Sequence, residues 1–379
     1  MFVARFLHRR ISSLEGRIVS DTLTVGIDPH RAVFTASVVD ERGRSVGYEH
    51  FENNRAGHTA ALDWIRGQGT VERIGVEGAS GLGRPLAEYL VAEGIDVRDV
   101  PPHRTSLRQR GRHEGKSDRL DAHRVALETQ NNDALACAFK SSRPAPPDRI
   151  RDQIALWHNT RTSLRKIRVQ LIGELDDLIH QLPEAVRAAM PVRATVRAKI
   201  NAVAKLDVDD VTDPLSLLRL ELIGRRITML KDVMSQERTA QAELAKLVNQ
   251  TGSSLPTVPG IAALAAAEIL LETGDVRRFK EAGFARFNGT APIPASSGEA
   301  GGRPKRHRLN RGGNRRLNAV LHRIAMIQLR CDPRARELYD RATRNGHTRR
   351  EAMRILKRHL SNVIYRTMVR DLPSQPKLT

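Results

Sequence analysis

The chain has 379 residues, 40% of them hydrophobic, so it can build two or three domains with ordinary cores. Lys and Arg outnumber Asp and Glu by 63 to 43, and a net charge of +20 makes nucleic acid the first partner to expect. No apolar run is long enough to span a membrane, and two cysteines exclude a disulfide scaffold and a cysteine zinc site, so we expect a cytoplasmic protein with no membrane partner.

The first third of the chain alternates strand and helix patterns. Residues 1–21 are a basic extension that lacks the apolar core and cleavage motif of a secretory signal. Hydrophobic periodicity, turn residues and Gly or Pro breaks then predict eight elements. These are strands at 22–28, 33–39 and 45–51, a helix at 57–65, a strand at 73–78, a helix at 84–94, a strand at 95–100 and a helix from about 118. This order, βββαβαβα, predicts a ribonuclease H-like, or RuvC-like, domain.

Two long helices follow a linker rich in Pro and Ser at residues 140–150. Apolar residues recur at steps of three and four, which is the heptad pattern of a coiled coil. They are Leu164, Ile167, Leu171, Leu175, Leu178 and Leu182 in the first helix, and Leu220, Ile223, Ile227, Leu230, Met234, Leu244 and Val248 in the second. Pro183 ends the first helix, and Glu237 and Gln241 interrupt the second stripe. The partner of each stripe is either the other helix or another subunit.

The C-terminal third is mostly helical and strongly basic. Residues 255–270 resemble a helix-hairpin-helix, an element that binds nucleic-acid backbones, although Ala262 replaces its usual second Gly. A loop rich in Gly, Pro and Ser follows, then a basic run, a helix starting near Gly313 and a last helix at about 349–370. From residue 300 onward the chain has 21 basic and 5 acidic residues, so we expect a surface that binds phosphates.

The predicted fold class is therefore α/β plus α, in three domains. The predicted boundaries are 1–21 for the extension, 22–140 for the RuvC-like domain, 141–250 for the linker and coiled coil, 251–370 for the C-terminal domain and 371–379 for the tail.

Four acidic residues are placed where they can meet. Asp28 and Glu77 end two predicted strands, and strand ends converge on one edge of an α/β sheet. Asp118 and Asp121 are three residues apart at the start of a helix, so both face the same side. Taken alone, this pair fits a solvated helix start, where acids favour the positive end of the macrodipole. Together with two more acids it fits a site for a shared divalent cation, which prefers oxygen ligands.

Three histidines, His30, His113 and His123, are near these acids in the sequence. A single histidine is more often a surface group than a ligand, so we leave all three out of the predicted site.

Four stretches of the sequence occur together, in this order, in one known family. GIDPH, VEG, KSDRLDA and GTAPIPASSG with the following RGGN resemble the DEDD transposases of the IS110 insertion-sequence family. The resemblance covers residues 22–365. It implies an N-terminal RuvC-like domain, a coiled coil and a C-terminal transposase domain. It also implies that Asp28, Glu77, Asp118 and Asp121 bind Mg²⁺, in a site for one or two ions.

The same resemblance implies a serine nucleophile and nucleic-acid partners. The serine before Gly in the loop after GTAP is Ser297, with Ser296 as the neighbouring alternative. The implied partners are double-stranded target and donor DNA, a structured guide RNA made by the element, and further copies of the chain in a dimer that pairs into a tetramer. We expect these residues to bind nucleic acid: Arg303, Lys305, Arg306, Arg308, Arg311, Arg315 and Arg316.

Other functions fit part of this pattern. A junction-resolving nuclease that uses water would need the four acids but not Ser297. A non-catalytic, nucleic-acid-binding relic of a transposase would need neither, and the presence of all five residues argues against it. A sugar-kinase-like ATPase shares the strand meander but needs glycine-rich phosphate loops, which are absent from the sequence.

Overall fold

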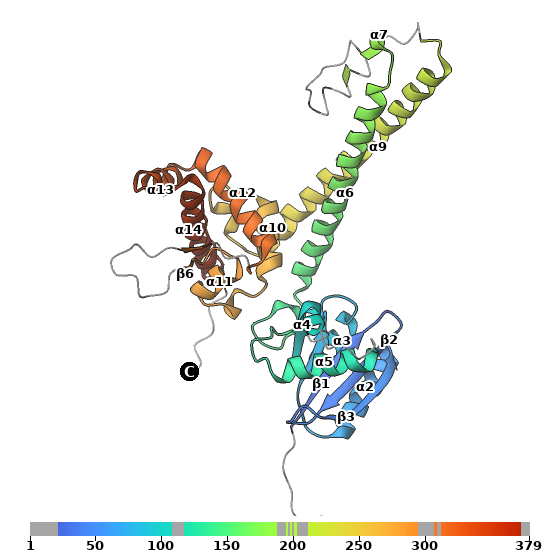
Figure 1. Cartoon of the computed structure of the whole chain (residues 1–379), viewed down its shortest axis with the longest axis vertical. Coiled ribbons are helices and arrows are strands. Elements are labelled where there is room, and N and C mark those ends of the chain that lie inside the picture. Colours follow the sequence, from blue (N-terminus) through green and yellow to red (C-terminus); the bar gives the residue numbers. More distant parts are fainter. Residues whose placement is uncertain are drawn as a thin grey trace, which may run out of the picture. The chain divides into compact units, whose positions relative to one another are not determined.

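The computed structural model describes residues 22–107, 117–187, 195, 198, 201–202, 211–294, 307–308 and 312–372. The chain divides into two compact units, Met1–Asp148 and Arg149–Thr379 (Figure 1). Each unit is described by itself, and the domain boundaries expected from the sequence stay predictions.

The first unit is built on a mixed five-stranded sheet. Its strands are β1 Leu23–Pro29, β2 Val33–Val39, β3 Ser45–Glu52, β4 Val71–Glu77 and β5 Val97–Val100. They lie in the order β3-β2-β1-β4-β5. β1 pairs antiparallel with β2 and parallel with β4, and β4 pairs parallel with β5. An antiparallel meander followed by two parallel strands on the other side of β1 is the strand arrangement of a ribonuclease H-like domain, as predicted.

Alternation along β1 assigns its side chains to the two faces of this sheet. Val25 and Ile27 belong to the apolar core that also contains buried residues of α2 Arg55–Gln68 and α3 Arg84–Ala92. Gly26 between them faces the opposite side, where α5 Asp118–Gln130 packs on β1, β2 and β4. The helices of this unit are α2 Arg55–Gln68, α3 Arg84–Ala92, α4 Pro102–Leu107 and α5 Asp118–Gln130, and a 3₁₀ turn, η2, spans Ala138–Lys140.

The second unit begins with two long antiparallel helices, α6 Arg149–His180 and α9 Pro214–Gln250 (Figure 1). The short helix α7 Glu184–Arg187 follows α6. Most of the predicted apolar stripe is buried between α6 and α9, so each helix packs against the other. The structure establishes a helix pair, while a supercoiled geometry and the pairing of subunits stay predictions.

One stripe position was predicted wrongly. Ile167 is 43% exposed, whereas Leu164 and Leu171 are buried. The neighbouring Arg168 faces the seam instead, where its Nε donates to Glu237 Oε2 at 2.8 Å and Arg161 approaches the other oxygen at 3.3 Å. The acid that interrupts the apolar stripe is therefore paired with two arginines across the helix interface, which explains how a charge is accommodated there.

The remaining elements form a helical cluster, and its apolar core also includes Ile154 of α6 and Leu244, Leu247 and Val248 of α9. Gly260, at φ +81°, makes the turn between η3 Leu255–Thr257 and α10 Ala263–Thr273 that the helix-hairpin-helix pattern predicts. Helix α13 Pro333–Arg344 was not predicted. The elements are η3 Leu255–Thr257, α10 Ala263–Thr273, η4 Val276–Arg278, α11 Glu281–Phe287, β6 Ile293–Pro294, β7 His307–Arg308, α12 Arg315–Cys331, α13 Pro333–Arg344 and α14 Arg349–Arg370. Within the described residues, every helix is too short or too polar to cross a membrane.

Candidate functional site

Asp28 and Glu77 are brought together by the register of two parallel strands. Ile27 in β1 is paired with Val76 in β4, so the next residues along the strands, Asp28 and Glu77, are neighbours at the same edge of the sheet. Asp28 is 6% exposed. Residues two positions apart on a strand point to the same face. Gly26 and Gly75 face α5, so Asp28 and Glu77, each two residues further along its strand, also lie on the face that α5 covers.

Two glycines allow α5 to lie directly on that face. A Cβ on Gly26 would overlap the backbone of Ala122 and Ala126, and a Cβ on Gly75 would overlap the side chain of Thr129. Each glycine precedes a site acid by two residues and so shares its face. The glycines of VGID and RIGVE therefore set the distance between helix and sheet.

The start of α5 supplies the other two acids. Ser117 caps the helix, its side chain accepting from the Leu120 amide. Asp118 is exposed, while Asp121 is 8% exposed and its Oδ1 accepts from Arg124 Nη1 at 2.8 Å. Helix α5 crosses β1 where Ala122 and Ala126 lie over Gly26. The turn of α5 before this crossing carries Asp118 and Asp121, and it therefore lies toward Asp28 at the end of β1.

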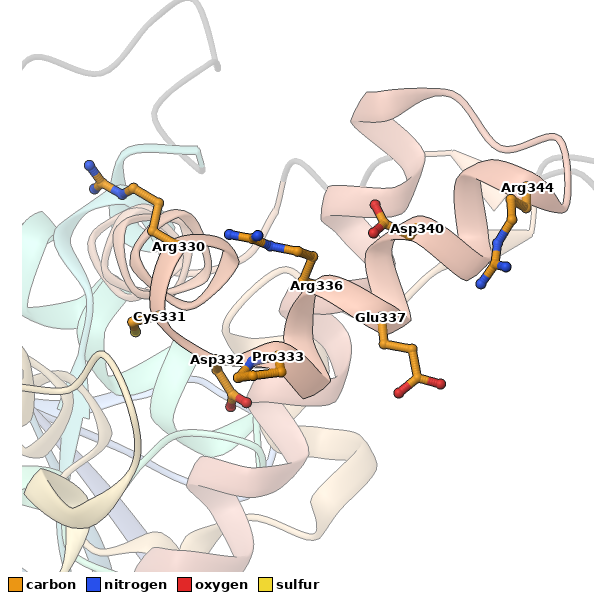
Figure 2. A pocket seen from close by; sticks show the side chains of 8 residues that line it. All are labelled: Arg330, Cys331, Asp332, Pro333, Arg336, Glu337, Asp340 and Arg344. Carbon is orange, nitrogen blue, oxygen red and sulfur yellow. The ribbon is translucent and has the colours of Figure 1, made fainter.

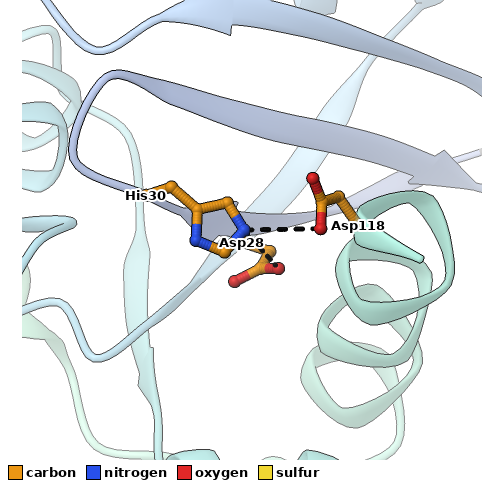
Figure 3. A group of neighbouring side chains, drawn as sticks. All are labelled: Asp28, His30 and Asp118. Atoms are coloured by element: carbon orange, nitrogen blue, oxygen red, sulfur yellow. Dashed lines mark ion pairs between the residues drawn. The ribbon is translucent and has the colours of Figure 1, made fainter. Parts of the chain in front are cut away.

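His30 belongs to this cluster, contrary to our expectation from the sequence. Its Nε2 lies 3.5 Å from Asp28 Oδ2 and 3.5 Å from Asp118 Oδ1 (Figure 3). Ligand atoms of these three residues all lie within 4.8 Å of one another, close enough to hold one metal ion. His30 is in the turn between β1 and β2, where its amide donates to the Val33 carbonyl. The GIDPH motif contained this signal, since His30 and Asp28 are only two residues apart.

The pKa of Asp28 shows that ionisation of this side chain is unfavourable in the free protein. Burial, together with the nearby carboxylates of Glu77 and Asp121, raises the pKa of Asp28 to about 6, although His30 acts in the opposite direction. A bound cation would remove this penalty by stabilising the ionised form. An acidic cluster at this edge therefore suits a divalent metal ion, and the use of all four carboxylates as ligands stays a prediction.

Thr105 orients Glu77. It is buried, and its hydroxyl donates to Glu77 Oε1 at 2.5 Å while also lying 2.8 Å from the Pro102 carbonyl oxygen. Sequence reasoning missed this residue because a threonine in a short helix carries no distinctive pattern.

The predicted serine and most of the predicted basic residues lie outside the part of the chain that the structure describes. These are Ser296, Ser297, Arg303, Lys305, Arg306 and Arg311. Arg308 belongs to β7, and Arg315 and Arg316 begin α12. Both of these α12 residues are exposed, and Arg316 lies 3.6 Å from Glu272. Their roles stay predictions.

The two ends of the serine-containing loop are held together tightly. The Asn314 amide donates to the Phe287 carbonyl at 2.6 Å, and Ile293 and Pro294 pair with Arg308 and His307. A Cβ on Gly313 would overlap the backbone of Gly289. The NGTAP and RGGN stretches therefore form the root of the loop, and their glycines allow these two chain segments to touch.

A separate concave surface lies at the corner between α12 and α13 (Figure 2). Three arginines and three acids line it, so it has no net charge that would attract a polyanion. Its lining residues are Arg330, Cys331, Asp332, Pro333, Arg336, Glu337, Asp340 and Arg344.

Comparisons with known proteins agree with the motifs. A family model described as a transposase of the DEDD IS110 type matches residues 25–191, and one described as "Transposase IS116/IS110/IS902 family" matches residues 252–340. The chain is 26% identical to an uncharacterized 44.8 kDa protein of insertion element IS116 from Streptomyces clavuligerus, over 93% of this chain and 95% of the relative. It is 32% identical to an uncharacterized 42 kDa protein of IS900 from Mycobacterium paratuberculosis, over 37% of this chain and 33% of the relative.

Among solved structures, the chain is similar to T. thermophilus RuvC in complex with a Holliday junction substrate. The identity is 14%, the match covers 31% of this chain and 99% of that chain, and the TM-score of 0.24 is too low to support an inference.

The ribonuclease H-like fold, its acidic edge and the two family models define a DNA-processing enzyme of the transposase class. The chain belongs to the IS110 family of insertion-sequence transposases.

Proposed function

We propose that this transposase cuts and exchanges DNA strands at a Mg²⁺ site formed by Asp28, Glu77, Asp118 and Asp121. The convergence of β1, β4 and the start of α5 at one sheet edge, with the raised pKa of Asp28, is the observation that carries the proposal. Bound Mg²⁺ would stabilise negative charge on the attacking and leaving oxygens. The chain's own part is to hold the carboxylates at this edge, with Thr105 fixing Glu77.

The proposed nucleophile is Ser297. Its hydroxyl oxygen attacks a DNA phosphorus, its proton passes to a base or solvent, and a DNA hydroxyl leaves as the serine–DNA phosphoester forms. A hydroxyl of a second strand then attacks the same phosphorus and releases the serine. The number of phosphoester bonds is unchanged, so exchange needs no external energy source. The close approach of Gly289 and Gly313 supports this role, because it fixes the described residues on either side of the segment that contains Ser297.

The proposed partners are donor and target DNA, read through a structured guide RNA, in a dimer that pairs into a tetramer in the cytoplasm at the nucleoid. The net charge of +20 supports the nucleic-acid partners. Large apolar side chains exposed near the start of α9, at Leu215, Leu217 and Leu218, support contacts between subunits. Light scattering of the complex with RNA and DNA tests the assembly, and a monomer would contradict it.

The acidic site is tested with single Asp→Asn or Glu→Gln variants of the four acids. Each should abolish strand cleavage while nucleic-acid binding is retained, because the loss of one oxygen ligand weakens the metal site. Asp63→Asn, which removes an exposed acid from α2, is the matched control and should cut normally. Full recombination by Glu77→Gln would contradict the assignment.

The serine is tested by trapping the covalent product on a suicide DNA substrate and mapping it by mass spectrometry. Ser297→Ala should eliminate both the adduct and recombination. An adduct that disappears only in Ser296→Ala would move the nucleophile by one residue. Normal cleavage without any adduct in the double variant would favour the hydrolytic nuclease instead.

A further inference from the structure

A chain of hydrogen bonds connects Lys357, on α14, to the root of the serine-containing loop. The Lys357 ammonium donates to Asn318 Oδ1 at 2.6 Å. The Asn318 amide nitrogen in turn donates to the Asn288 carbonyl oxygen at 2.7 Å. Asn288 directly precedes Gly289, which touches Gly313. The ammonium is therefore two hydrogen bonds from the point where the loop begins.

The network beneath this ammonium is rigid. Asn288 is completely buried, its amide nitrogen donates to Ser361 at 2.8 Å, and its Oδ1 accepts from the Thr290 hydroxyl at 2.7 Å. Buried amides with satisfied donors and acceptors fix one arrangement of the chain. Lys357 is thus held at a defined position relative to the loop root.

The charge of Lys357 is not needed for this network. An ammonium group has three donors, and the bond to Asn318 uses one of them. Within the described residues, Lys357 forms no ion pair with a carboxylate, and its partial burial lowers its pKa, which opposes the charged form. A neutral amide could make the same hydrogen bond at a lower desolvation cost. Positive charge is added nearby by Arg315, which lies one turn before Asn318 on α12 and is exposed.

We propose that Lys357 binds a backbone phosphate of the DNA strand that the serine-containing loop acts on. A half-buried ammonium with free donors, fixed at the loop root, can hold one phosphate in a constant place relative to that root. The inference rests on the proposed role of Ser297 for its effect on the reaction, but the phosphate contact itself does not depend on which group attacks.

Three variants test the proposal. Lys357→Gln keeps a donor for Asn318 and removes the charge, and Lys357→Arg keeps the charge. Lys246→Met is the matched control, because this exposed lysine on α9 is already paired with Glu243 at 2.6 Å. The probes are a fluorescent duplex that contains the junction between the element end and its flank, and the element's non-coding RNA alone. Affinity for each is measured across a salt series, alongside the melting temperature.

Lys357→Gln should bind the duplex about tenfold more weakly. The negative slope of log affinity against log salt should become shallower by about 0.9, the value for one lost phosphate contact. RNA affinity and the melting temperature should not fall, and Lys357→Arg should restore most of the duplex affinity. An unchanged duplex slope in Lys357→Gln would overturn the proposal. A salt slope that becomes shallower for the RNA instead of the duplex would overturn the proposal too.

Adduct formation separates this inference from the proposed serine chemistry. If wild-type protein forms the adduct, Lys357→Gln should form it at least about tenfold more slowly at subsaturating duplex. An equal rate there would overturn the role of Lys357 at the loop. If wild-type protein forms no adduct, the serine mechanism fails, and the duplex salt slope alone still decides whether Lys357 binds a phosphate.

Discussion

The carboxyl groups of Asp28 and Glu77 lie side by side at the ends of two parallel strands, close enough to share a hydrogen bond when one of them is protonated. Two carboxylates at this distance repel each other when both are ionised, and burial strengthens the effect. The free protein therefore keeps a proton on Asp28 to a higher pH than an exposed aspartate would. A cation can replace that proton, which links the stability of this unit to pH and to metal.

The first prediction is that Asp28 makes the metal-free protein less stable as the pH rises. The pKa of Asp28 is about 6 in the folded state, against 3.8 for an ordinary aspartate. Its contribution to stability is full below the lower value and is lost as the pH rises through about 6. The melting temperature in EDTA should fall more between pH 4.5 and 7.5 in the wild type than in Asp28→Asn. Added Mg²⁺ should raise it at pH 7.5 much more than at pH 5. Equal pH dependence in both proteins would contradict this explanation.

The second prediction concerns the contact of α5 with the sheet. A Cβ on Gly26 would lie 2.6 Å from the Ala126 Cα and closer still to other backbone atoms, so Gly26→Ala must displace α5. We expect a loss of about 3 kcal/mol or more in the free energy of unfolding, with weaker metal binding because Asp118 and Asp121 move away from Asp28. Gly67→Ala is the control: its Cβ would meet nothing within 4 Å, and this helical site should gain about 0.5–1 kcal/mol. Denaturant unfolding and Mg²⁺ titration measure both effects, and equal stability of the two variants would show that α5 can shift freely.

The third prediction is that His30 affects which metal the site prefers. Mg²⁺ favours oxygen ligands, while imidazole suits later divalent metals better. His30→Ala should retain Mg²⁺-dependent cleavage but lose part of its affinity for Mn²⁺, because the Nε2 atom lies 3.5 Å from both Asp28 and Asp118. Titration of cleavage with each metal measures the ratio. A variant that loses activity with Mg²⁺ and Mn²⁺ alike would make His30 a general part of the site.

The strand pattern allowed much of the first unit to be predicted. The predicted strand ends placed Asp28 and Glu77 at one edge of the sheet, and the three-residue step placed Asp118 and Asp121 on one side of a helix. The contribution of His30 could not be foreseen, because it depends on the conformation of the turn at residues 30–32. Gly26 and Gly75 looked like ordinary strand residues, although their closeness to α5 builds the site.

The helical unit was harder to predict at specific positions. Ile167 fits the heptad by spacing, but Arg168 occupies the seam because Glu237 offers a partner there. Helix α13 was missed because its sequence, PRARELYDRATR, is dominated by charged residues. Only Ala335 and Ala342 are buried along it, with Leu338 partly buried against the core. These few apolar residues share one face, but the segment is so polar overall that its sequence resembles that of an exposed loop.

The last prediction separates the loop root from the metal site. Gly313→Ala would force the Cβ into the backbone of Gly289 and within 3.0 Å of the Phe287 carbonyl oxygen, so the two ends of the loop must part. We expect DNA cleavage and adduct formation to fall by at least about tenfold. Mg²⁺ binding and the pH dependence of stability due to Asp28 should stay as in the wild type. Gly283→Ala is the matched control in the same helical cluster, because its Cβ would meet nothing within 4 Å. If Gly313→Ala forms the adduct at the wild-type rate, the closed root does not position the loop for reaction. Loss of Mg²⁺ binding in Gly313→Ala would contradict the predicted independence of the loop root and the metal site.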